Sequence, residues 1–220
     1  MSKKKVGVIL SGCGVRDGSE IHESVGLLIH LVRAGFEPVF MAPGILQRHT
    51  VDHLSGEVTV EKRHVHVESA RIARGPVMDL SEVEVDDYVA FMLPGGFGAV
   101  TNLCDFADRG IECEVIAPLR KLLEEAHEAG KVLGFMCIAP VIAARVFGRL
   151  GVRVTIGSDK KTAEAIEAMG ARHIVTDASG HCVDERHLLI SVPAYMEARD
   201  ICECYDSAGI LVDRLIELLS

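Results

Sequence analysis

Short, continuously apolar runs alternate along the chain with longer segments in which apolar residues recur every three or four positions. Four runs have the pattern of buried strands, at residues 6–10, 38–41, 88–93 and 132–136. Runs that are apolar on both faces are typical of a parallel sheet covered by helices on each side. The alternation therefore predicts a doubly wound α/β fold of the flavodoxin-like kind, with a mostly parallel sheet and right-handed crossovers.

The first predicted helix carries its apolar residues on one face. These residues are Ile21, Val25, Leu28, Ile29 and Val32. Asp17 and Glu20, three positions apart, predict a capping box at the start of this helix, and Gly35 is its expected C-cap.

The remaining segments complete the predicted alternation. Further helices are expected over residues 113–129, 140–147 and 201–219. The segment from 44 to 86 is less regular, and a short strand is expected within it at 64–67. Near the C-terminus, residues 174–175, 182–183 and 187–192 predict a strand followed by a hairpin.

Composition narrows the class of protein. The 220 residues, of which 49% are hydrophobic, fit one compact domain over 1–220. A formal charge of -9 argues against nucleic acid and anionic membranes as partners, and no apolar run is long enough to span a bilayer. Seven cysteines without a C-x-x-C pair, and no secretory signal, favour free thiols and a cytoplasmic location.

The loop after the fourth predicted strand carries the strongest chemical signal. Cys137 follows the strand at 132–136, and Pro140 fits the first turn of the next helix. A thiol at a helix N-terminus is expected to have a lowered pKa, as at a nucleophile elbow. A buried structural cysteine is the alternative, because cysteine is often buried without reacting.

Two other loops should meet Cys137 at the carboxyl edge of the sheet. Gly95 and Gly96 follow the third predicted strand, where they suit either an oxyanion site or a tight turn. Glu20 and Glu23 open the first helix, either as proton-transfer groups or as ordinary N-terminal acids. His22 is a further candidate base, on the polar side of this helix.

Taken together, these segments resemble the DJ-1/PfpI superfamily, which has the class I glutamine-amidotransferase-like fold. Within it the chain is most similar to the ElbB family, glyoxalase-like proteins linked by name to isoprenoid biosynthesis. The motifs that carry the resemblance are VILSGCG (8–14), GSEIHE (18–23), ESARIARG (68–75), PGGFGA (94–99) with Asn102 and Leu103, GFMCIAP (134–140), TAE (162–164) and PAYM (193–196).

The resemblance assigns a role to particular residues. It implies that Cys137 is the elbow nucleophile, that Glu23 is the carboxylate in contact with it, and that Gly96 and Ile138 supply oxyanion-binding amides, with Gly95 beside them. Further candidates for the pocket are Cys13, Glu20, His22 and Asn102. Relatives are often homodimers, so a homodimer is expected.

Departures from the superfamily pattern narrow the expected chemistry. Ile138 stands where PfpI-type proteases carry a histidine, and Gly157 occupies the region where other relatives place one. The Cys–His–acid triad of a peptidase or glutaminase is therefore not expected. The leading hypothesis is a glyoxalase that converts small 2-oxoaldehydes to 2-hydroxy acids without glutathione, metal or other cofactor. The alternatives are a binding or redox-sensing module, or an amidotransferase-like accessory protein.

Overall fold

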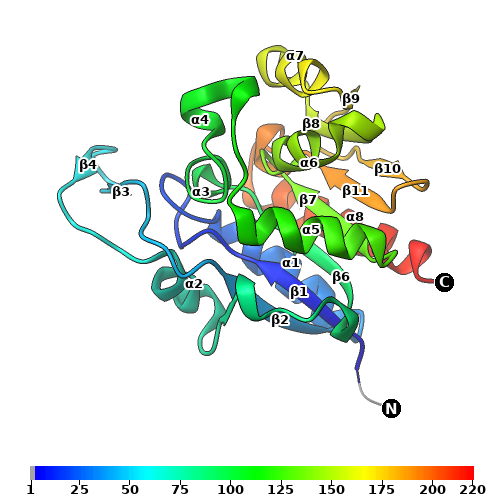
Figure 1. Ribbon diagram of the computed structural model, residues 1–220, viewed down its shortest axis with the longest axis horizontal. Helices are drawn as coiled ribbons and strands as arrows, with labels where there is room; N and C mark the ends of the chain where they lie inside the picture. The colour runs from blue at the N-terminus through cyan, green and yellow to red at the C-terminus, as the bar shows by residue number, and fades with distance from the viewer. Residues whose placement is uncertain (1–2) are drawn as a thin grey trace.

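The computed structural model describes residues 3–220 and centres on a seven-stranded sheet in the order β10-β11-β7-β6-β1-β2-β5 (Figure 1). Its strands are β1 (Lys5–Ile9), β2 (Glu37–Ala42), β5 (Met78–Asp79), β6 (Tyr88–Leu93), β7 (Val132–Met136), β10 (Cys182–Asp184) and β11 (Leu189–Val192). Every neighbouring pair is parallel except β10 and β11, which form the expected hairpin. The predicted doubly wound α/β fold is confirmed.

Helices cover both faces of this sheet. They are α1 (Ile21–Arg33), α2 (Val65–Ala73), α3 (Phe97–Thr101), α4 (Phe106–Arg109), α5 (Ala117–Glu128), α6 (Pro140–Phe147), α7 (Lys160–Ala168) and α8 (Ile201–Leu218). Leucines of α1 and α8 belong to one buried apolar cluster, whereas α3, α5 and α6 contribute to the other. Figure 1 shows α5 in front of the sheet with α1 and α8 behind it. The central strands are consequently buried on both sides.

Two small strand pairs lie outside the main sheet. A hairpin of β3 (Thr50–Val51) and β4 (Val58–Thr59) projects at one end of the molecule (Figure 1). The parallel pair of β8 (Arg153–Gly157) and β9 (Arg172–Val175) is connected by α7. Sequence analysis missed β8 and α7. Ile166 is the one buried residue of α7, so its helical periodicity is weak.

Two of the predicted elements were wrong in kind or in extent. Residues 64–67 are not a strand, because α2 begins at Val65 and continues to Ala73. The helix expected from residue 113 begins only at Ala117, with Pro118 in its first turn. The residues before it are extended, since Val115 forms an isolated bridge with Cys104.

The predicted capping box at the start of α1 is also wrong. Glu20 itself is the N-cap, and its Oε2 accepts a 2.7 Å hydrogen bond from the Glu23 amide. Asp17 instead accepts a 2.8 Å hydrogen bond from the amide of Val51 on β3. Asp17 thereby ties the loop before α1 to the projecting hairpin.

The apolar face that the sequence indicates on α1 is largely exposed. Ile21, Val25, Ile29 and Val32 are 42%, 43%, 37% and 55% exposed, respectively. The opposite face of α1 is buried, and its leucines pack in one cluster with residues of α8. The periodicity of α1 therefore identified the helix but not its core-facing side.

Candidate active site

Cys137 occupies the sharp turn between β7 and α6. Its φ of 59° lies in the left-handed region, which is costly for a residue with a side chain. Its amide donates a 3.0 Å hydrogen bond to the Val192 carbonyl at the end of β11, which fixes the turn. The structure thus places Cys137 on the predicted strand-to-helix elbow, where it is 8% exposed.

Glu23, in the first turn of α1, points at this cysteine and is completely buried. Its Oε2 accepts a 2.7 Å hydrogen bond from the Gly95 amide, and its Oε1 accepts a 3.3 Å bond from the Tyr195 amide. A further hydrogen bond joins the carboxyl to the Cys137 thiol. Glu23 is therefore held in place by two separate loops as well as by its own helix.

Burial controls the protonation of this pair. Desolvation, with a smaller contribution from the nearby charge of Glu20, raises the pKa of Glu23 to about 7. Desolvation and the charge of Glu23 raise the pKa of Cys137 well above its ordinary value. The lowered thiol pKa expected from the helix N-terminus is therefore wrong. The thiol keeps its proton at neutral pH, whereas the Glu23 carboxyl gains or loses its proton near pH 7.

The Gly95–Gly96 turn closes over the cysteine. A Cβ at Gly95 would lie 2.4 Å from Cys137 Cβ and 2.8 Å from Glu23 Oε2, so this position has no room for a side chain. The amides of Gly96 and Ile138 both donate hydrogen bonds to the Cys137 sulfur, which lowers the pKa of the thiol in part. The predicted pair of backbone donors thus faces the sulfur atom.

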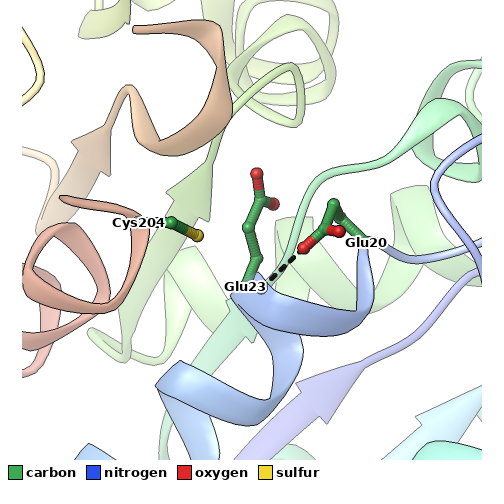
Figure 2. A group of neighbouring side chains, drawn as sticks. All are labelled: Glu20, Glu23 and Cys204. Carbon is green, nitrogen blue, oxygen red and sulfur yellow. Dashed lines mark hydrogen bonds between the residues drawn. The ribbon is translucent and has the colours of Figure 1, made fainter. Parts of the chain in front are cut away.

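Glu20 and Cys204 also lie close to Glu23, and the Glu20 amide donates a 3.0 Å hydrogen bond to the Gly95 carbonyl of this turn. Figure 2 shows the two carboxylates at the start of α1 and the Cys204 side chain directed toward them from α8. One carboxylate oxygen of each acid and the Cys204 sulfur all lie within 4.8 Å of one another, and all three residues are buried. Burial and the charges of both glutamates raise the pKa of the Cys204 thiol.

This trio is the only set of three such side chains in residues 3–220 whose ligand atoms gather closely enough for a metal ion. Its carboxylates, however, are already engaged by backbone amides of Glu23, Gly95 and Tyr195. Both carboxylates therefore have hydrogen-bond partners within the protein.

Sequence analysis missed Cys204 and Tyr195 as members of the site. Tyr195 follows Ala194, whose φ of 42° turns the chain so that the Tyr195 amide meets Glu23. Its hydroxyl lies 2.7 Å from Nδ1 of the exposed His22. The PAYM motif could have indicated Tyr195. No local signal could have indicated Cys204, because only the packing of α8 on α1 brings it to the site.

Asn102 and Cys13 have other surroundings. Asn102 Nδ2 donates to the carbonyls of Ser11 and Asp17, at 2.9 and 2.8 Å, and its Oδ1 accepts from the Arg48 amide. All its hydrogen-bonding groups are thus used to hold loops together. Cys13 is half-buried, and desolvation followed by the charge of Glu68 raises the pKa of its thiol.

The chain is similar to several known proteins, although no protein-family model matches it. A human glutamine amidotransferase-like class 1 domain-containing protein 3, named mitochondrial, is 42% identical over 97% of this chain and 83% of its own length. A mitochondrial ES1 protein homolog from Rattus norvegicus is 40% identical over 98% and 84%, respectively. A mitochondrial ES1 protein from Danio rerio is 31% identical over 97% and 85%.

Solved structures show the same fold. An isoprenoid biosynthesis protein with an amidotransferase-like domain from Ehrlichia chaffeensis superposes with a TM-score of 0.93, at 30% identity over 99% of this chain and all of that one. DJ-1beta of Drosophila melanogaster superposes with a TM-score of 0.58 at 18% identity, over 97% and 91% of the two chains. The second comparison supports the fold alone.

These relatives also correct the expected location. The expected cytoplasmic location is wrong on this comparison, because the three curated relatives are all named mitochondrial. No helix within residues 3–220 has the length and apolar character needed to cross a membrane. With relatives of up to 42% identity along nearly its whole length, the chain belongs to the class 1 glutamine amidotransferase-like family.

Proposed function

We propose that this protein is a glyoxalase-type enzyme that converts glyoxal or methylglyoxal to the corresponding 2-hydroxy acid without glutathione. The observation that carries the proposal is the buried Glu23, whose pKa of about 7 and hydrogen bond to Cys137 suit it to move protons at neutral pH. Its substrate is a small aldehyde, and the chemistry uses the Cys137–Glu23 pair alone.

The first step is addition of sulfur to the aldehyde. Glu23 removes the thiol proton of Cys137, and the thiolate attacks the aldehyde carbon to form a hemithioacetal. The alkoxide formed is bound by the amides of Gly96 and Ile138, which already donate to the sulfur. Once Glu23 has taken up the thiol proton it is uncharged, so it does not repel the alkoxide that forms beside it.

The second step moves a proton between neighbouring carbons. After the alkoxide has taken up the proton, the Glu23 carboxylate removes the hydrogen from the former aldehyde carbon, giving an enediol. It returns the proton to the adjacent carbon, which leaves a 2-hydroxyacyl thioester on Cys137. Water then hydrolyses the thioester and releases the acid and the free thiol. Overall, methylglyoxal and one water give lactate, with no net oxidation or reduction.

Lactate formation from methylglyoxal by metal-stripped protein without glutathione tests the proposal. Cys137→Ser and Glu23→Gln should each lower kcat/KM by at least about a hundredfold, the range typical of lost proton-transfer groups. Cys202→Ser is the matched control, because Cys202 is an exposed thiol that can also react with aldehydes. Full activity in either Cys137→Ser or Glu23→Gln would refute the assigned mechanism.

A non-enzymatic small-molecule-binding module is the second candidate. The observation that favours it is the deep burial of the Cys137 thiol, whose raised pKa limits the thiolate available for turnover. This candidate predicts slow methylglyoxal turnover together with tight, Cys137-dependent binding of another metabolite. Calorimetric titrations of wild type and Cys137→Ser with candidate metabolites separate it from the enzyme.

We also propose that the protein forms a homodimer through α1. The exposed face of this helix carries Ile21, Val25, Ile29 and Val32 at helical spacing. In a chain with a formal charge of -9, this face presents no carboxylate, because the one acid of α1, Glu23, is buried. Two copies can therefore pack along α1 without burying acidic groups against each other.

A further inference from the structure

His22 and Tyr195 form a side-chain contact beside the candidate site that the proposed chemistry does not use. A 2.7 Å hydrogen bond joins His22 Nδ1 to the Tyr195 hydroxyl, and the two rings are tilted by 50° with their centroids 5.8 Å apart. The two residues are 173 positions apart in the sequence. Their bond therefore ties the start of α1 to the short 3₁₀ turn η5 (Ala194–Met196), which follows β11.

This bond is part of a closed set of contacts around the Glu23 carboxyl. The Tyr195 hydroxyl is bonded to His22, the residue directly before Glu23, while the Tyr195 amide donates to Glu23 Oε1 at 3.3 Å. Tyr195 thus contacts α1 twice, through its side chain and through its backbone. The amide bond is longer than the 2.7 Å bond from Gly95 to Glu23 Oε2, so a small movement of η5 is enough to break it.

The η5 turn depends on neighbouring elements for its conformation. Ala194 has a φ of 42°, in the left-handed region that is costly for a residue with a side chain. The Ala194 amide donates a 3.2 Å hydrogen bond to Ser207 Oγ on α8, which holds the start of the turn. On the opposite side, the Tyr195 hydroxyl reaches α1. Without that second attachment, the strained turn is free to move the Tyr195 amide away from Glu23.

The position of this amide matters because Glu23 lies close to a balance between its two protonation states. The titratable groups that face it from α1, from the elbow and from α8 are Glu20, Cys137 and Cys204. Burial and the charge of Glu20 raise the pKa of Glu23 to about 7, whereas hydrogen bonds from Cys137, Gly95 and Tyr195 lower it in part. Loss of the Tyr195 amide would therefore favour the protonated acid.

From these contacts we infer that His22 and Tyr195 are positioning residues for Glu23, whose side-chain bond keeps the Tyr195 amide on the carboxyl oxygen. In this role His22 acts through Tyr195 and exchanges no proton with a substrate. The importance of the pair for turnover rests on the proposed function. Its effect on the protonation of Glu23 does not, because that effect follows from the hydrogen bonds alone.

Titration of Glu23 tests the inference without requiring turnover. The carboxyl carbon is followed by ¹³C NMR in the full-length protein labelled at glutamate, and its signal is assigned by its absence from Glu23→Gln. Tyr195→Phe and His22→Ala should each raise the pKa of Glu23 by about 0.5 to 1 unit, because a hydrogen bond to the charged form is lost. His22→Asn should keep the wild-type value, since its side-chain oxygen can accept a hydrogen bond from the Tyr195 hydroxyl.

Tyr205→Phe is the matched control. The Tyr205 hydroxyl also accepts a hydrogen bond from a side chain of α1, that of Arg33, but at the opposite end of the helix. This variant should leave the titration of Glu23 unchanged. Adding His22→Ala to Tyr195→Phe should cause no further rise, because the bond between the two side chains is already absent. An unchanged pKa of Glu23 in Tyr195→Phe, or a further rise in the double variant, would overturn the inference.

Turnover separates this inference from the proposed function. In a protein that converts methylglyoxal, the acid limb of the pH profile of kcat/KM should move to higher pH in Tyr195→Phe, by the same amount as the NMR titration. A protein that is inactive on methylglyoxal, but in which Tyr195→Phe still raises the pKa of Glu23, would refute the proposed function and support the positioning role.

Discussion

The amide of Gly95 donates a 2.7 Å hydrogen bond to Oε2 of Glu23, the same oxygen that a side chain at position 95 would crowd. This bond links the turn after β6 to the first turn of α1, with the Cys137 sulfur beside both. The turn that contributes the Gly96 amide and the buried carboxyl are therefore positioned as one unit. A change to either residue is expected to disturb the other.

Gly95→Ala should destabilise the protein and remove the proposed activity. The added Cβ would lie 2.4 Å from Cys137 Cβ, so the turn must move away from the cysteine. We expect a loss of about 2 kcal/mol or more in the free energy of unfolding, as for an overpacked core. Chemical denaturation measures it. Gly75→Ala is the control, since no atom lies within 4 Å of the added methyl group; equal effects would contradict the prediction.

Glu23→Gln should change how stability depends on pH. The pKa of Glu23 is about 7 in the fold and about 4.3 in an unfolded chain, so the folded state binds the proton more tightly. Wild type should therefore lose stability relative to Glu23→Gln as pH rises from about 4.5 to 7. The full difference is on the order of 3 kcal/mol above that window. Denaturant unfolding of both proteins across this pH range measures the difference. If the free energies of unfolding of wild type and Glu23→Gln change in parallel with pH, the pKa of Glu23 is not raised and the prediction fails.

Glu20→Gln should move the acid limb of the pH–rate profile to lower pH. The charge of Glu20 contributes to the raised pKa of Glu23, so removing that charge makes Glu23 ionise more readily. Glutamine retains an oxygen that can accept the hydrogen bond from the Glu23 amide. Glu164→Gln, at an exposed acid of α7, is the control and should leave the profile unchanged. A shift of the acid limb toward higher pH would contradict the prediction.

Cys137→Gly should be more stable than Cys137→Ala, although both lack the sulfur atom. Position 137 has a φ of 59°, where glycine is unstrained and alanine is not. The difference between the two variants should be about 1 kcal/mol in the free energy of unfolding. Denaturant titration of the pair measures the backbone strain at the elbow. Equal stability of the two variants would mean that the elbow stores no backbone strain.

Val25→Glu should convert the proposed dimer to a folded monomer. Val25 is 43% exposed on α1, so the single chain tolerates a carboxylate there, whereas a packed α1 interface does not. Light scattering after size-exclusion chromatography gives the mass, and circular dichroism checks the fold. Val67→Glu, at a 58% exposed valine of α2, is the matched control. A monomeric wild type would remove the basis of the proposal.

Local sequence was sufficient to identify most of the framework. The strands at Tyr88–Leu93 and Val132–Met136 and the helix Pro140–Phe147 match the predicted ranges, because apolar runs and a proline are local signals. The position of Cys137 directly after a buried strand predicted that it lies on an elbow. The predicted start of α1, in the loop after the first strand, placed Glu23 near the same edge of the sheet.

Tertiary structure decided the features that depend on distant segments. Which side of α1 is buried depends on where α8 packs, so the apolar face from Ile21 to Val32 identified a helix but is not the face that the core buries. The inclusion of Cys204 in the site has the same origin. Asp17 became a partner of Val51 because the β3–β4 hairpin folds back onto its loop.

The protonation of the site was likewise beyond the sequence. Helix-end position alone predicts a lowered pKa for Cys137, but desolvation and the charge of Glu23 reverse that direction. Residue order determined that a thiol and a carboxyl would lie at the same edge of the sheet. Glu23 is completely buried only because loops and helices pack around it. This burial determined whether the thiol or the carboxyl holds the proton.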